Sequence, residues 1–223
     1  MHANILPRPP RLIRVNAARV GCLLAILFFL SGCRGEEEDS ARRSSMEEAV
    51  KAALADKNPY VKGRGAAAAA EMNYLSLLPE LRAAVGDPHW FVRYRALAAL
   101  QRLRDRGSLG IFVERLNDSD ASVRFKALEG VAEVGDYSEL PRIAEKLGDP
   151  DAYVRAAAAY ALGKLKVAEA VPPLIRALSG DDREVVRREA YLALKKITGK
   201  KFSRRPEEWD RWWREKGEGG EAP

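Results

Sequence analysis

The chain has 223 residues, of which 47% are hydrophobic and 31% are charged, as in folded helical proteins rather than disordered ones. The formal net charge is +6, but residues 1–32 hold four arginines and no acid, so the remainder carries only +2. A chain so close to neutrality has no strong electrostatic attraction for phosphate backbones, and nucleic-acid binding is therefore the least favoured function.

Residues 1–32 have the features of a bacterial export signal. Four arginines precede an apolar run over residues 20–30. This run is shorter than the ~20 residues that span a bilayer as a helix, but it suits a signal-peptide core. The sequence LSGC at residues 30–33 resembles the lipobox of bacterial lipoproteins. An uncleaved signal anchor, or a signal that is cut elsewhere, is the alternative.

The lipobox resemblance implies that the chain is cut before Cys33 and that the Cys33 thiol carries a lipid. A lipid anchor would hold the protein on the bacterial cell membrane or outer membrane, facing the periplasm or the exterior. Residues 33–45 are then predicted to be the lipidated cysteine and a disordered tether, because residues 34–45 lack apolar side chains that could pack.

A repeat follows from residue 46 to residue 198. Valines recur at spacings of 31, 31, 31 and 32 residues, each five residues after an aspartate and directly before a basic residue: Val61, Val92, Val123, Val154 and Val186. Pairs of apolar residues spaced i, i+4 precede each valine at the same period. Fixed periods of this size indicate stacked supersecondary units.

Each unit is predicted to contain two helices. The first is short, with Pro79, Pro141 and Pro172 near the start of three copies. The second buries the valine and the residues four, eight and eleven further along, which form one face. We expect the aspartate to cap the second helix, with Pro88 and Pro150 at its first position. The extra residue of the last copy is expected in a turn at residues 179–180.

The pattern Asp-Pro-x-x-x-Val-Arg-x-x-Ala-x-x-Ala-Leu resembles HEAT repeats, particularly the short bacterial type associated with phycobilin lyases. The fold class is therefore all-α: an α-solenoid of five HEAT-like repeats of about 31 residues. The resemblance implies a structural ladder between successive repeats, formed by the aspartates and bases Asp56, Asp87, Asp118, Asp149, Asp181, Lys62, Arg93, Arg124, Arg155 and Arg187. The first copy departs from the pattern at Lys62 and Gly65, which suggests a looser terminal repeat.

The period ends after residue 198. Residues 199–216 resemble a closing segment that follows HEAT-like arrays in secreted bacterial proteins, with Trp209, Trp212 and Trp213 on one helical face. We expect a capping helix over the last repeat; a partner-binding tryptophan patch is the alternative. Residues 217–223 are predicted to be a disordered tail.

The sequence offers no catalytic or metal-binding constellation. Its two histidines are His2 and His89, and the two cysteines lie in or directly after the predicted signal, so neither a zinc site nor a disulfide is expected. No nucleotide-binding or hydrolase motif is present, and no cofactor is expected. We therefore expect a protein that is not an enzyme.

Aromatic and basic residues gather around the start of the second helices. Aromatic and arginine side chains are enriched in binding hot spots, so these residues form a candidate partner-binding surface: Tyr60, Arg64, Trp90, Phe91, Tyr94, Arg95, Phe125, Lys126 and Tyr153. The alternative is that the rings pack between neighbouring helices and the bases are only solvated.

These features favour a membrane-anchored scaffold or protein-binding module that holds a protein or peptide partner. Two alternatives stay open. A lyase-like or chaperone-lyase protein would bind a chromophore-type ligand, and a nucleic-acid-binding HEAT protein would show salt-dependent DNA binding.

Overall fold

The computed structural model describes residues 38–135 and 137–218. The predicted signal peptide, the lipid site at Cys33 and residues 219–223 of the predicted tail lie outside these ranges. Within them the regular structure is entirely α- and 3-10-helical, without a strand. No helix of this described part is long and apolar enough to cross a membrane.

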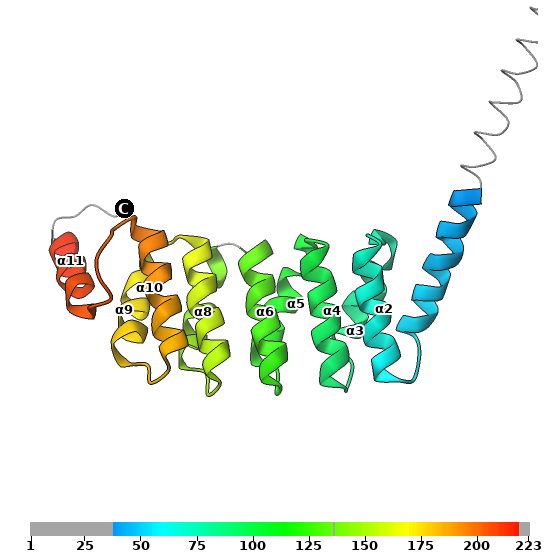
Figure 1. Cartoon of the computed structure of the whole chain (residues 1–223), viewed down its shortest axis with the longest axis horizontal. Coiled ribbons are helices and arrows are strands. Elements are labelled where there is room, and N and C mark those ends of the chain that lie inside the picture. The colour runs from blue at the N-terminus through cyan, green and yellow to red at the C-terminus, as the bar shows by residue number, and fades with distance from the viewer. Residues whose placement is uncertain (1–37, 136, 219–223) are drawn as a thin grey trace, which may run out of the picture. The chain divides into compact units, whose positions relative to one another are not determined.

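The described chain begins with a helix over residues 38–54 (Figure 1). The α-helices that follow it are α2 Pro59–Glu71, α3 Leu78–Ala84, α4 Trp90–Arg102, α5 Leu109–Glu114, α6 Ala121–Val134, α7 Leu140–Glu145, α8 Ala152–Leu165, α9 Val171–Gly180, α10 Glu184–Thr198 and α11 Pro206–Glu218. Single turns of 3-10 helix lead into or out of several of the short helices.

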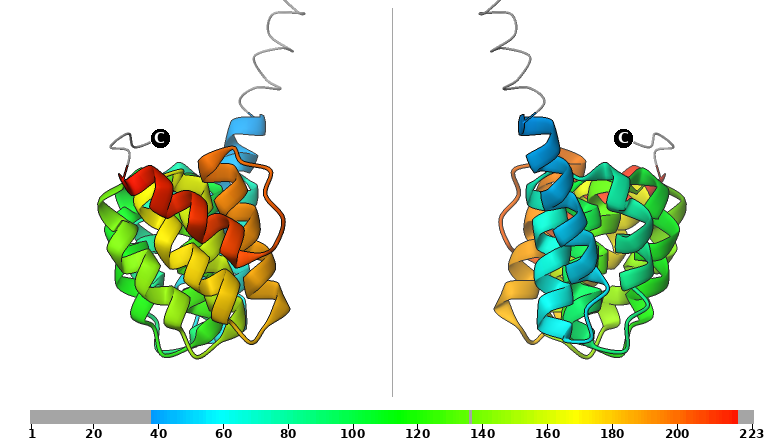
Figure 2. Two further views of the ribbon diagram at one scale, coloured as in Figure 1. Left: turned by 90° about the vertical axis from the view of Figure 1, so that its left-hand side faces the viewer. Right: turned by 90° about the vertical axis from the view of Figure 1, so that its right-hand side faces the viewer.

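Residues 47–223 contain a compact unit built of two layers. The second helices α2, α4, α6, α8 and α10 stand side by side in Figure 1, and each packs on its neighbours. The short helices α3, α5, α7 and α9 form the other layer, each against the second helix of its own repeat. The end-on views of Figure 2 show the two layers directly. The predicted all-α solenoid of two-helix repeats is confirmed.

The helix over residues 38–54 differs from the predicted disordered tether, which was expected to reach residue 45. The tether sequence is rich in good helix formers such as Ala41, Arg42 and Arg43. Once residues 47–54 are held by packing, each further residue adds a helical hydrogen bond without a new nucleation cost. A helix can therefore extend through a segment that has no apolar face of its own.

The core is formed by the two periodic rows of apolar residues. In the first helices Leu81, Phe112, Ile143 and Leu174 are completely buried, and in the second helices the valines from Val92 onward are too. Val61 is only half-buried, which distinguishes the first repeat. Gly65 does not loosen the packing of this repeat, however. A Cβ added at Gly65 would lie 3.0 Å from the Ala53 Cβ, so the glycine permits close packing.

The expected capping role of the repeated aspartates is wrong. The second helices α6 and α8 are capped by Asp120 and Asp151, whose carboxylates accept from the backbone N–H groups two and three residues further along. The repeated aspartates stand two residues earlier and bend the loop: Asp118 accepts from the Asp120 N–H, and Asp149 from the Asp151 N–H. Pro88 and Pro150, which were predicted at the first helical position, therefore lie in this loop, before α4 and α8 begin.

The extra residue of the last repeat is not in a turn. Residues 179–180 belong to α9, which runs for 10 residues, whereas α5 and α7 each end after 6 and continue as a 3-10 turn. The longer α-helix absorbs the insertion. Proline lies at the first or second position of α3, α7 and α9, as predicted.

The C-terminal helix α11 packs against α9 and closes the end of the array (Figure 2). Trp209 is completely buried, its ring edge-on to Phe202 at 5.1 Å, and its Nε1 donates to the Ser203 carbonyl at 2.9 Å. Gly199 ends α10 with φ +69°, a left-handed conformation that glycine adopts at little cost. The predicted tryptophan-rich capping helix is confirmed.

Candidate protein-binding surface

A groove crosses the N-terminal ends of α4, α6 and α8. We call it the aromatic groove; it has a volume of 470 Å³ and is lined by Trp90, Phe91, Tyr94, Arg95, Ala121, Ser122, Phe125, Asp151 and Tyr153. The solenoid brings these residues together because positions 31 residues apart lie on neighbouring helices. Six residues of the predicted surface meet here, and Tyr60, Arg64 and Lys126 lie beside the groove.

The rings at the α2–α4 edge of the groove contact one another. The Tyr60 and Phe91 ring centroids are 5.4 Å apart, and Trp90 meets Phe91 edge-on at 5.8 Å. His89 lies between Trp90 and Tyr60, and its Nδ1 accepts from the Phe91 N–H, so it caps α4. Tyr60 and Trp90 nevertheless expose 62% and 43% of their surface.

Phe91 packs between neighbouring helices because α2 carries a glycine opposite it. A Cβ added to Gly63 would lie 2.4 Å from Cε1 of the Phe91 ring. Gly63 thus leaves a depression into which Phe91 settles, which makes Phe91 a half-buried floor residue rather than a free ring. Tyr153 differs: it exposes 63% of its surface. The aromatic set therefore contains both packed and solvent-facing members.

Tyr94 and Phe125 form the half-buried middle of the floor and pack against the core. The Lys126 ammonium lies 5.3 Å from the Tyr94 ring centroid and 5.9 Å from that of Phe125. Lys126 also forms an ion pair with Glu129 on its own helix. Its charge is therefore already neutralised within the solenoid.

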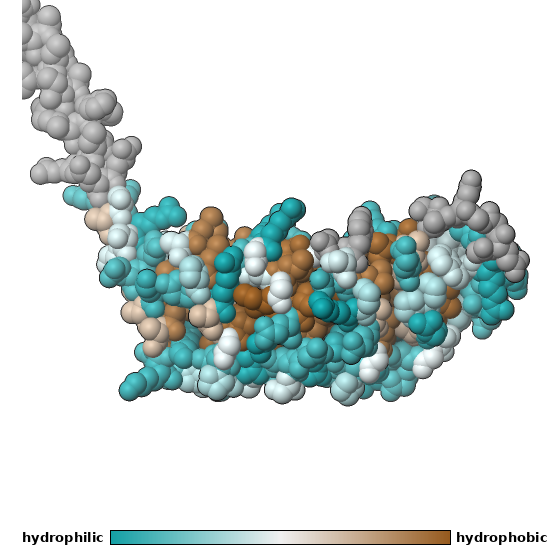
Figure 3. Space-filling view, turned by 180° about the vertical axis from the view of Figure 1, so that it is seen from behind, coloured by the Kyte–Doolittle hydropathy of each residue, from teal (hydrophilic) through white to brown (hydrophobic). Residues whose placement is uncertain are grey.

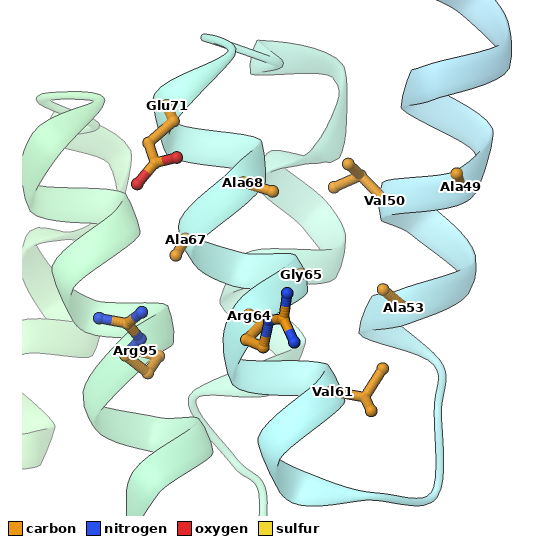
Figure 4. Close-up of a pocket in the computed structure, with 10 residues that line it drawn as sticks. All are labelled: Ala49, Val50, Ala53, Val61, Arg64, Gly65, Ala67, Ala68, Glu71 and Arg95. Atoms are coloured by element: carbon orange, nitrogen blue, oxygen red, sulfur yellow. The ribbon is translucent and has the colours of Figure 1, made fainter.

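A second pocket, of 510 Å³, lies at the first repeat (Figure 4). It is lined by α2, by Ala49, Val50 and Ala53 of the preceding helix, and by Arg95 of α4. Figure 4 shows Arg64 and Arg95 on the adjacent helices α2 and α4. Arg95 lines both this pocket and the aromatic groove, so it is the residue that joins them.

The opposite face, formed by the first helices, also carries apolar patches (Figure 3). Leu109, Ile111 and Leu140 are half-buried there and pack on the core. We attribute this surface to packing, since its side chains are aliphatic and already in contact with the interior.

The repeated aspartates and arginines form ion pairs between successive repeats. Arg93 donates from Nε and Nη2 to both Asp118 carboxylate oxygens at 2.8 and 2.6 Å. Arg124 binds Asp149 in the same bidentate way at 2.8 Å, and Arg155 binds Asp181 at 2.7 and 2.9 Å. Such fork-shaped pairs fix orientation as well as adding binding energy.

Each ladder arginine also donates from Nη1 to the loop of its own repeat. Arg93 reaches the Asp87 carbonyl at 3.0 Å, and Arg124 reaches the Asp118 carbonyl at 2.9 Å. One guanidinium therefore ties the loop that precedes its own helix to the next repeat. At the ends the pattern changes: Lys62 makes a single bond to Asp87, and Arg187 pairs with Glu184 of its own helix.

The ladder carboxylates are held in their charged form. Burial on its own would raise the pKa of Asp118, but hydrogen bonds from Arg93 and the Asp120 N–H, with the guanidinium charge, bring it below its usual value. The pKa values of Asp87, Asp149 and Asp181 are lowered by the same balance of burial and hydrogen bonding. In the described part of the chain, no cluster of residues could hold a metal ion.

The sequence matches the family model of HEAT repeats over residues 46–129 and 109–195, which is well over half of the chain. The chain belongs to the HEAT repeat family. No curated protein sequence matches it significantly.

Solved structures have a similar fold at low sequence identity. A chain from the complex of CpcE and CpcF of phycocyanin lyase from Nostoc sp. PCC7120 matches with 20% identity and a TM-score of 0.62, over 69% of this chain and 65% of that one. This chain thus spans just under two thirds of the length of that relative.

Two artificial proteins match with somewhat lower TM-scores. An engineered protein matches with 20% identity and a TM-score of 0.56, over 69% of this chain and 79% of that one. A designed armadillo repeat protein in complex with the peptide (KR)4 matches with 18% identity and a TM-score of 0.55, over 72% and 85%. Identities this low establish the fold alone.

The sequence alone did not point to four contributors to the surface of this HEAT solenoid. Ala121, Ser122 and Asp151 line the groove, and Gly63 sets the depth of Phe91. Asp151 and Ser122 stand three residues and one residue before valines of the repeat, so register alone could have placed them. Gly63 could not be found in that way, because its role depends on a side chain from the next repeat.

Proposed function

We propose that this HEAT-repeat protein is a lipid-anchored extracytoplasmic scaffold that binds a protein or peptide partner in the aromatic groove. The observation that carries the proposal is the groove itself: exposed Trp90 and Tyr153 flank a floor of half-buried rings, with Arg95 at one end. Aromatic and arginine side chains around a recess are the composition of binding hot spots.

The ordered floor supports a binding role. Phe91, Tyr94 and Phe125 are held by packing against the solenoid, so a partner meets rings that are already fixed. Binding to fixed rings loses less side-chain entropy than binding to mobile ones. The likeness to a designed armadillo repeat protein in complex with a peptide supports a fold that can present such a surface.

The anchor is proposed from the LSGC sequence and the arginine-rich apolar segment before it. Intact mass of membrane-extracted protein tests it: we expect a chain that begins at Cys33 and carries added acyl mass. Replacement of Cys33 by Ser should release the protein from the membrane fraction. A full-length wild-type chain with a free Cys33 thiol would contradict the anchor and leave the groove proposal intact.

Crosslinking in the native membrane, followed by mass spectrometry, tests partner binding. The triple variant Trp90→Ala, Arg95→Ala, Tyr153→Ala removes the groove's exposed rings and its arginine, and should lose the crosslinked partner. Tyr160→Ala is the matched control, because this exposed α8 ring is not among the residues that line the groove. Unchanged partners in a folded triple variant would contradict the proposal.

A lyase-like protein that binds a chromophore is the second candidate, favoured by the likeness to a chain of the phycocyanin lyase complex. It requires that the purified protein hold or take up a tetrapyrrole-like ligand. An absorbance spectrum in visible light distinguishes the two: a colourless protein that retains its crosslinked partner supports the scaffold.

A further inference from the structure

We infer that the aromatic groove selects a short extended peptide with an acidic residue beside an apolar one, the acid being bound by Arg95. This inference rests on the proposed function and adds the chemistry of the partner. It follows from the charges, contacts and length of the groove.

Arg95 is the least satisfied cation of the groove. Its Nε is buried and has no hydrogen-bond partner. Its guanidinium lies 5.7 Å from the Phe91 ring centroid, and within residues 38–135 and 137–218 it makes no ion pair. A guanidinium that lies beside aromatic rings and has no carboxylate partner within the protein is arranged to bind a carboxylate of another molecule.

Two other bases close to the groove are already paired. Arg93, two residues earlier on α4, donates from Nε and Nη2 to the two carboxylate oxygens of Asp118, and Lys126 is paired with Glu129. Arg64 resembles Arg95, since no ion pair is formed by it in the described ranges. Glu71, the acid that lines the pocket of both arginines, lies two turns along α2 and pairs with neither.

The charges of the groove give it a direction. Arg95 stands at the α4 end, while Asp151 lines the groove at the α8 end. The Asp151 carboxylate already caps α8 by accepting from the N–H groups of Tyr153 and Val154, but its charge still repels a second acid. An acidic residue is therefore favoured at the α4 end, and an apolar side chain over Tyr94 and Phe125 next to it.

The length of the groove suits a short peptide. It spans α4 to α8, which is two helix spacings of about 8–10 Å each. An extended chain rises by about 3.3 Å per residue, so about five or six residues cover that distance. Two unpaired arginines are too few for strong adhesion to an anionic membrane surface, where each base contributes only about 1 kcal/mol. A peptide is the occupant that uses both the rings and the arginine.

Fluorescence anisotropy on the full chain in detergent tests the inference. The probes are three labelled six-residue peptides of sequence AXFLAA, in which X is Glu, Gln or Lys. We expect the Glu peptide to bind at least about tenfold more tightly than the Gln peptide, because a charge-assisted hydrogen bond replaces a neutral one. Arg95→Gln should abolish this preference, and Arg95→Glu should transfer it to the Lys peptide.

Arg102→Gln is the matched control: it removes the same charge from the same helix, at an exposed position that does not line the groove. It should keep the preference for the Glu peptide. Equal binding of all three peptides, with loss of all three in Trp90→Ala, would overturn the acidic preference and leave the proposed function standing. Arg95-dependent binding to phosphatidylglycerol vesicles, without peptide binding, would overturn the inference in favour of a lipid.

Discussion

The ladder and the aromatic groove use the same residue types on the same second helices in opposite ways. In the ladder, Arg93 and Asp118 are nearly buried and neutralise each other across repeats. In the groove, Arg95 stands two residues along from Arg93 and lacks a carboxylate in the described chain. Arginines close together on one helix therefore hold the repeats together in one case and, as we propose, bind a partner in the other.

The sequence register explains this difference. A base follows the valine in every repeat, so each internal copy finds an aspartate in the next one. The groove residues belong to particular repeats: the position of Tyr94 is Gly63 in the repeat before and Phe125 in the repeat after. Residues common to all repeats build the array, and residues that vary between repeats give it one distinctive surface. Changes to the ladder residues and to the groove residues, made separately, test these two roles.

The largest expected effect is that of acid on the ladder. The pKa values of the ladder carboxylates Asp87, Asp118, Asp149 and Asp181 are lowered in the folded state, so the unfolded chain binds more protons than the folded one as the pH falls. Their stabilisation is complete about one unit above the unfolded pKa of about 3.9, and is lost as the pH falls through the lowered folded values. Guanidinium unfolding between pH 7 and pH 2.5 should show this loss.

The variant Asp149→Asn provides the control for the acid experiment. It should be less stable at pH 7 and should lose less of its stability on acidification, because one of the coupled carboxylates is gone. An unchanged pH dependence would show that other carboxylates govern acid unfolding.

The second-largest expected effect on stability is that of breaking a single arginine–aspartate pair of the ladder. Arg93→Ala leaves the Asp118 carboxylate buried without its bidentate partner, and such losses cost about 3–5 kcal/mol. The free energy of unfolding, measured by circular dichroism in denaturant, should fall by that amount. Arg102→Ala on the exposed side of α4 should change it by less than about 0.5 kcal/mol. Similar losses in both variants would contradict a special role for the ladder.

A smaller effect is expected where α2 receives Phe91. Gly63→Ala places a methyl group against the Phe91 ring, and overpacking of this kind costs about 1–3 kcal/mol. Alanine favours the helix by about 1 kcal/mol relative to glycine, so the free energy of unfolding should fall by a net amount of up to about 2 kcal/mol. Gly110→Ala in α5, where nothing lies within 4 Å of the new Cβ, should instead be stabilising. Thermal unfolding of the two variants should therefore shift in opposite directions.

The smallest effect on stability belongs to the groove's exposed ring. Tyr153→Ala should change the free energy of unfolding by less than about 0.5 kcal/mol, since the side chain is 63% exposed. Its effect on partner binding should exceed 1 kcal/mol if it is a hot spot. Titration of the partner that crosslinking identifies against the Tyr153→Ala and Tyr160→Ala variants measures this change in binding free energy. Equal affinities would remove Tyr153 from the binding surface.

Much of the fold could be predicted because the repeat is encoded at a fixed period. The buried rows from Leu81 and Val92 onward, the prolines at the starts of α3, α7 and α9, and the closing helix with Trp209 follow from spacing and helix chemistry. Local detail was less predictable: Asp120 and Asp151, not the repeated aspartates, cap their helices. Both arrangements satisfy backbone N–H groups, so sequence alone did not separate them.

The sequence by itself determined the number of repeats, the face that each helix buries and the positions that carry ladder charges. Only the tertiary structure decided that Phe91 sinks against Gly63, that Tyr153 stays exposed and that Arg95 lacks a carboxylate. The physical reason is that periodicity fixes which side of a helix faces its neighbour. How deeply a side chain settles depends on the size and charge of residues contributed by the next repeat.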